Sequence, residues 1–65
     1  MKNCICINDY LSFSGILFQN KVEFCYFIDT ITSNHILNDN YIVIKNEIQK
    51  IRLTEEQFKK HFDEK

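Results

Sequence analysis

The sequence has almost none of the residues that break regular structure, and no strong charge imbalance. It contains one glycine, no proline and no tryptophan, and its formal net charge is −1. A near-zero charge argues against a dedicated phosphate-backbone binder and against a DNA mimic, because both act through a large field of one sign. With 65 residues the chain has room for a single small domain spanning residues 1–65, and this length excludes most enzyme architectures.

Signals for export and for membrane insertion are also missing. Asn8 and Asp9 interrupt the apolar start of the chain before it reaches the length of a signal peptide. The longest uncharged stretch, residues 10–20, is about half the length that crosses a bilayer. Three cysteines are an odd number for a disulfide framework. We therefore expect a cytoplasmic protein with reduced thiols and no membrane segment.

Hydrophobic patterning predicts a mostly β domain. The clearest strand is expected over residues 21–29, where every second residue is apolar and lies on one face: Val22, Phe24, Tyr26 and Ile28. Aromatic and β-branched residues predict further strands over residues 13–18 and, at an edge, over residues 4–7. A two-residue hairpin turn at Gln19-Asn20 is expected to join the strand over residues 13–18 to the one that follows.

The middle of the chain predicts a loop and then a second pair of strands. Residues 30–39 are rich in Ser, Thr, Asn and Asp, whose side chains compete for backbone hydrogen bonds, so a long loop is expected there. Residues 40–45 and 48–53 predict strands joined by a turn at residues 45–47. Several apolar residues between positions 41 and 51 also fall at helical spacing, but the β-branched run and Asn46 favour strands.

The sharpest local signal lies near the C-terminus. Thr54 and Gln57 have the spacing of a capping box, in which each side chain bonds to the other residue's backbone N–H. Leu53 and Phe58 occupy the two hydrophobic staple positions around this cap. The pattern predicts a helix over residues 55–62 that docks two phenylalanines on the sheet and frays where acidic residues oppose its dipole.

This second half, N-Y-I-V-I-K-N-E-I-Q-K-I-R-L-T-E-E-Q-F-K-K-H-F, resembles the end of small SH3-like β-barrel proteins encoded by phages and mobile elements of low-GC bacteria. In those proteins two strands around a polar turn lead into S/T-x-E-x-F-x-x-x-F, a pattern that residues 54–62 match. The chain departs from the family at the turn, which often holds D-G or N-G, because its only glycine is Gly15. The resemblance implies an α+β fold, a small antiparallel barrel of four to five strands with a short C-terminal helix.

The resemblance indicates a biological context for the protein and no particular reaction. Its motif is a packing motif and brings no catalytic residue with it. Some small phage proteins bind one host protein and block defence or metabolism. We therefore expect a non-enzymatic protein that binds and inhibits a defence protein of its bacterial host, as an anti-CRISPR or similar inhibitor does. The alternative is a β-barrel that binds a small molecule or nucleic acid.

Metal and nucleophile chemistry can be drawn from the sequence but is not favoured. A zinc site can be assembled on paper from Cys4, Cys6, Cys25, His35 and His61. However, zinc turns use C-x2-C spacing, whereas C-x-C in a strand points both thiols to the same face, where cysteine packs as a small hydrophobe. A nucleophile, base and acid drawn from Cys25, His35 and Asp29 lack any glycine-rich oxyanion loop. We expect neither a metal nor a cofactor.

The excess of aromatic residues points to a partner instead. Nine of 65 residues are Phe or Tyr, more than one face of a small barrel and a short helix can bury. Candidate partner-binding residues lie on the second face of the first clear strand, around the predicted loop and on a later strand: Cys25, Phe27, His35, Tyr41, Lys50 and Arg52. The partner is expected to be a host protein or a second copy of the chain. Nucleic acid is disfavoured because nine acidic residues balance eight basic ones.

Overall fold

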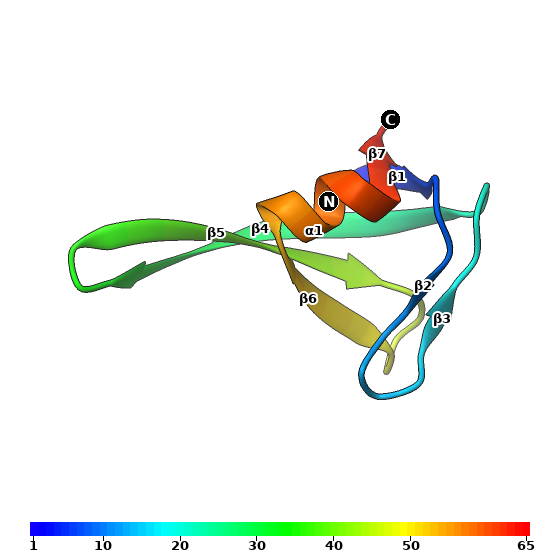
Figure 1. Cartoon of the computed structure of the whole chain (residues 1–65), viewed down its shortest axis with the longest axis horizontal. Helices are drawn as coiled ribbons and strands as arrows, with labels where there is room; N and C mark the ends of the chain where they lie inside the picture. Colours follow the sequence, from blue (N-terminus) through cyan, green and yellow to red (C-terminus); the bar gives the residue numbers. More distant parts are fainter.

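The computed structural model describes residues 1–65, and the chain is mostly β with one short helix (Figure 1). The elements are β1 (Lys2–Cys6), β2 (Tyr10–Leu11), β3 (Leu17–Phe18), β4 (Glu23–Ser33), β5 (Ile36–Ile44), β6 (Lys50–Thr54), α1 (Glu55–His61) and β7 (Phe62–Glu64). The main sheet is antiparallel in the order β6-β5-β4-β1-β7, and β2 and β3 form a separate two-stranded sheet. The predicted strand pair after residue 40 is confirmed, and its helical alternative is wrong.

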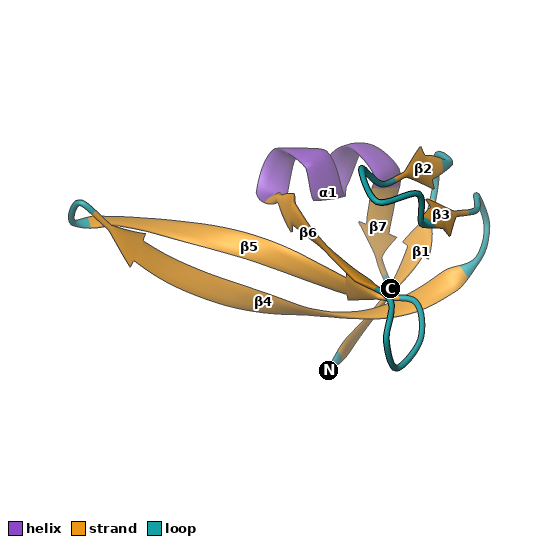
Figure 2. Cartoon of the chain, turned by 90° about the horizontal axis from the view of Figure 1, so that it is seen from below, coloured by secondary structure: helices purple, strands orange, loops and turns teal.

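The main sheet is open, so the closed barrel expected from the sequence is not formed. Strands β6 and β7 are the two edges of the sheet and do not pair with each other. The chain passes from one edge to the other through α1, which lies across one face of the sheet (Figure 2). We call this covered face the inner face and the opposite one the outer face. The β2–β3 hairpin lies on the same side of the sheet as α1 (Figure 2).

The core fills the space between the inner face, α1 and the β2–β3 hairpin. Phe18 from β3 and Phe58 from α1 are almost completely buried, together with Tyr26 from the sheet. The rings of Tyr26 and Phe58 have centroids 4.8 Å apart, and those of Phe18 and Phe62 are 5.8 Å apart. The buried cluster is Cys4, Cys6, Phe18, Tyr26, Tyr41, Val43, Ile51, Leu53, Phe58 and Phe62. The predicted burial of Phe58 and Phe62 is therefore confirmed, although Phe62 belongs to β7 and not to the helix.

The helix begins as its sequence predicts. The backbone N–H of Gln57 donates to Thr54 Oγ1 at 3.2 Å, and the backbone N–H of Thr54 donates to Gln57 Oε1 at 3.1 Å. This reciprocal pair is the predicted capping box. The helix ends at His61, one residue earlier than expected, because Phe62 is already extended with φ −134°.

Two expectations for the ends of the chain are wrong. β1 is not an edge strand, since it lies between β4 and β7 and Cys6 pairs with Phe62. Residues 63–64 do not fray but continue β7, where Asp63 pairs with Ile5. This pairing joins residues about fifty-eight positions apart, so no local signal in the sequence announces it.

The segment between β1 and β4 also differs from its prediction. No strand covers residues 13–18; instead a tight loop separates the short strands β2 and β3. Ser12 closes this loop, because its Oγ accepts from the backbone N–H of Ile16 at 2.9 Å, and Gly15 adopts the positive φ of 88° that the loop needs. The turn after β3 is centred on Asn20 and Lys21 rather than on Gln19-Asn20, and the strands it joins are not paired with each other.

The predicted loop over residues 30–39 is wrong as well, because β4 and β5 continue through it as a hairpin. Asn34 and His35 form its two-residue turn with φ values of 51° and 65°, the geometry that suits the twist of a hairpin. Polar side chains are satisfied across the strands: Thr30 Oγ1 donates to Asp39 Oδ1 at 2.8 Å. The hairpin extends well beyond the rest of the sheet (Figure 1). We call residues 28–39 the arm.

Candidate protein-binding surface

The strand register brings four of the predicted partner-binding residues together on the outer face. Phe27 on β4 pairs with Ile42 on β5, which pairs with Arg52 on β6. Cross-strand partners share one face of a sheet, so these three side chains form a row. A second row beside it holds Cys25, Ile44 and Lys50. We call these six residues the outer patch.

The outer patch combines an apolar centre with a basic border. Ile42 is only 8% exposed although it lies outside the core cluster, because Phe27 and Arg52 flank it on the neighbouring strands. Phe27 itself is 39% exposed. Lys50 and Arg52 are exposed at the β6 edge. No element of the chain covers this face in the way that α1 covers the inner one (Figure 2).

The remaining two predicted residues do not belong to the outer patch. His35 lies in the turn at the tip of the arm, well away from the two rows. Tyr41 is 6% exposed and lies on the inner face, so its prediction as a partner-binding residue is wrong. Alternation explains the error, because Tyr41 neighbours Ile42 in β5 and therefore points to the opposite face. The rings of Tyr41 and Phe58 stack with centroids 4.4 Å apart.

Sequence reasoning missed the apolar residues of the arm. Ile31 is 38% exposed, and Ile36 and Leu37 near the tip are 61% and 70% exposed. The prediction of a loop over residues 30–39 leaves these side chains out of the candidate surface. The Ile and Thr residues at positions 30–32 are nevertheless β-branched residues that favour strands. The arm and the outer patch are continuous, since both are built on β4 and β5.

The structure does not assemble the metal or nucleophile sets that can be drawn from the sequence. No three His, Cys, Asp or Glu side chains converge in a way that could hold a metal ion. Cys4 and Cys6 are buried in the core, where burial raises the pKa of Cys4 to about 12 and also raises that of Cys6. Cys25 is exposed on the outer face, whereas His35 is at the tip of the arm. A thiol–imidazole pair is therefore not formed.

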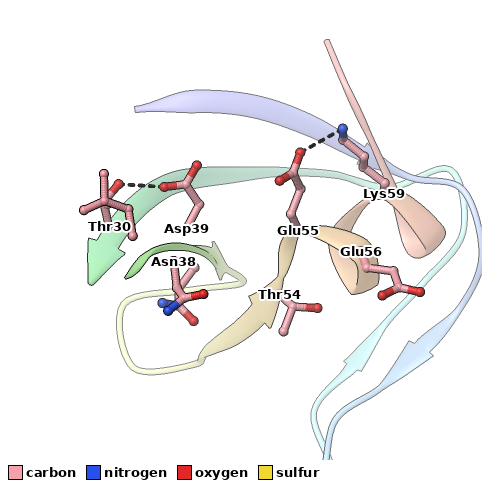
Figure 3. Close-up of a pocket in the computed structure, with 9 residues that line it drawn as sticks. Thr30, Asn38, Asp39, Thr54, Glu55, Glu56 and Lys59 are labelled. Atoms are coloured by element: carbon pink, nitrogen blue, oxygen red, sulfur yellow. Dashed lines mark hydrogen bonds and ion pairs between the residues drawn. The ribbon is translucent and has the colours of Figure 1, made fainter. Parts of the chain in front are cut away.

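A separate polar hollow lies where the arm meets the first turn of α1 (Figure 3). Its volume is about 970 Å³, and Leu37 is its only hydrophobic lining residue. Asp39 accepts from Thr30, and Glu55 forms an ion pair with Lys59 at 2.9 Å (Figure 3). The lining holds the carboxylates of Asp39, Glu55 and Glu56 and neither a thiol nor an imidazole.

Comparisons with protein-family models, curated proteins and solved structures find no match for this chain. The one helix has neither the length nor the apolar character to cross a membrane.

Proposed function

We propose that this chain is a non-enzymatic protein that binds another protein through the outer patch and inhibits it. The observation that carries the proposal is the row formed by Phe27, Ile42 and Arg52 on the face that no other element covers. Aromatic and arginine side chains around a desolvated centre are the groups that dominate binding energy at protein interfaces. A matching partner surface has an apolar centre and carboxylates that face Lys50 and Arg52.

The class of target comes from the resemblance to phage-encoded proteins. We propose a defence protein of the bacterial host, such as a CRISPR nuclease, bound in the cytoplasm. We also propose an SH3-like architecture for the fold. Its support is the meander β4–β5–β6 followed directly by the capped helix, which occupies the places that the resemblance assigns to these elements.

The test is a tagged pull-down from host lysate with identification by mass spectrometry, followed by affinity measurements on the captured protein. Phe27→Lys places a charge at the centre of the outer patch, and we expect it to weaken binding by at least about thirtyfold, the effect of losing about 2 kcal/mol. Phe13→Lys is the matched control, because Phe13 is fully exposed in the β2–β3 loop. It should bind as wild type does.

Circular dichroism must show that both variants keep the fold. Arg52→Glu should also weaken binding, because it reverses the charge at the border of the patch. Unchanged affinity of a folded Phe27→Lys variant would reject the outer patch as the binding surface.

The alternative function, nucleic-acid binding, has one observation in its favour. Phe27 shares the outer face with Lys50 and Arg52 of β6, and single-stranded nucleic acid is held by aromatic rings together with cationic side chains. The negative charge of Asp29 on the same face argues against nucleic-acid binding. Fluorescence anisotropy with a labelled single-stranded oligonucleotide distinguishes the two functions. Tight binding that weakens steeply with salt and is lost in Phe27→Lys would favour the alternative.

A further inference from the structure

One side of β4 has no neighbouring strand along the arm. The pairing of β1 with β4 ends at Lys2 and Tyr26, whereas the pairing of β5 with β4 continues to Ser33. Residues 28–33 therefore have a strand on one side only. This open edge runs along the side of the arm opposite β6 and α1 (Figure 2).

The register fixes which backbone groups point out from this edge. Ser33 and Ile36 flank the two-residue turn, and residues in that position exchange both of their backbone hydrogen bonds. Hydrogen bonding alternates along an antiparallel strand, so Ile28, Thr30 and Thr32 direct their N–H and C=O groups away from β5. A row of donors and acceptors with strand spacing is complementary to another extended strand.

The other strand edges of the main sheet are protected by charge. The β6 edge carries Lys50 and Arg52, and the β7 edge ends in Asp63, Glu64 and Lys65. The free edge of β5 faces the acidic hollow beside α1. Charged side chains are the usual means by which an edge is kept from pairing. The open edge of β4 has no lysine, arginine or proline, and its single charge is Asp29.

We propose that the open edge of β4 pairs antiparallel with the same edge of a second copy of this chain, about a two-fold axis at Thr30. In this register Thr30 faces Thr30, Ile28 faces Thr32 and Asp29 faces Ile31. No like charges are directly opposed, and Thr–Thr pairs are favourable across strands. The net charge of −1 per chain adds little repulsion. Pairing joins the two main sheets into one continuous sheet.

This inference does not rest on the proposed function, because it uses backbone groups of the arm rather than side chains of the outer patch. A two-fold contact of this kind is isologous and therefore closed, so it yields a dimer and not a filament. Dimer formation also explains why the arm stays regular although few of its side chains are buried. In the dimer β4 gains a second neighbouring strand, and β5 lies beside β4.

The experiment measures molar mass in solution by light scattering and sedimentation. Wild type should have twice the mass of Thr30→Pro, because proline removes an N–H that faces the open edge and leaves the bonds between β4 and β5 in place. Thr30→Val is the matched control. It loses the hydroxyl that donates to Asp39 but keeps the N–H, and it should remain a dimer.

Hydrogen exchange on the wild-type chain tests the proposal without any substitution. The amides of Thr30 and Thr32 should exchange about tenfold more slowly, or slower still, as the concentration rises into the dimer range, while Asn34 in the turn stays fast. A chain that stays monomeric at every concentration overturns the proposal. Edge amides that become protected only when a different protein is added overturn it too, since the occupant is then not a second copy. A folded Thr30→Pro variant with the mass of wild type does the same.

Discussion

The ring of Phe58 stacks on the ring of Tyr41 with centroids 4.4 Å apart and an angle of 23° between their planes. This contact fastens α1 to β5, and the ring of Tyr26 lies 4.8 Å from Phe58 on the neighbouring strand. The Phe58 side chain thus packs α1 against β4, the central strand of the sheet, and its neighbour β5. Much of the core depends on this single residue.

Replacing Phe58 by alanine should therefore destabilise the protein by roughly 3–5 kcal/mol, the cost of removing a buried phenylalanine ring. A domain of this size has little more than that in total, so most of the chain should be unfolded. Urea unfolding followed by circular dichroism measures the change. Phe13→Ala removes a fully exposed ring and should stay within about 0.5 kcal/mol of wild type. Equal stability of Phe58→Ala and wild type would contradict the packing described here.

The capping box predicts a smaller effect at the start of the same helix. Thr54→Ala removes the acceptor for the backbone N–H of Gln57 and should cost about 1 kcal/mol. Thr54→Ser keeps a hydroxyl at this position and should lose only a fraction of that. The midpoint of urea unfolding separates the two variants. A Thr54→Ser variant as unstable as Thr54→Ala would show that the methyl group, not the cap, matters.

The three thiols should differ sharply in reactivity. Cys25 is exposed, whereas Cys4 and Cys6 are buried and burial raises the pKa of each. Because the thiolate is the reactive form, Ellman's reagent should titrate one thiol in the folded protein and three after unfolding. Cys25→Ser should leave no rapidly reacting thiol. Rapid reaction of all three in the folded wild type would place Cys4 and Cys6 outside the core.

Stability should fall at alkaline pH. Burial raises the pKa of Cys4 from 9.0 to about 12, and burial together with the nearby Glu64 carboxylate raises the pKa of Tyr26 from 10.0 to about 12. The folded chain holds these protons more tightly than the unfolded chain, so the stabilisation is complete below about pH 9 and is lost as the pH rises toward 12. Urea midpoints measured from pH 7 upward should show the decline.

Tyr26→Phe isolates one contributor to this pH dependence. It removes the titrating hydroxyl, so the variant should lose stability less steeply than wild type between pH 10 and pH 12. If the stability of the two proteins falls equally steeply with pH, the alkaline loss comes from other groups. A substitution of Cys4 is then the next test.

Local features of this protein follow from short stretches of its sequence. The alternation around Tyr26 identifies the central strand and assigns Cys25 and Phe27 to its second face, because successive side chains point to opposite sides. The cap at Thr54 marks the start of the helix, because the bonds that form it lie within four residues. Both predictions depend only on neighbours along the chain.

Features that depend on pairing between distant residues are set only when the chain folds. β7 exists because Phe62 pairs with Cys6 of the first strand, and this partner is invisible to any local pattern. Polar residues between Thr30 and Asp39 form an arm because each strand supplies the other's hydrogen bonds, which outweighs their preference for turns. The strand register alone sets Phe27 and Arg52 in one row on the outer face, and the same register leaves the edge of β4 open.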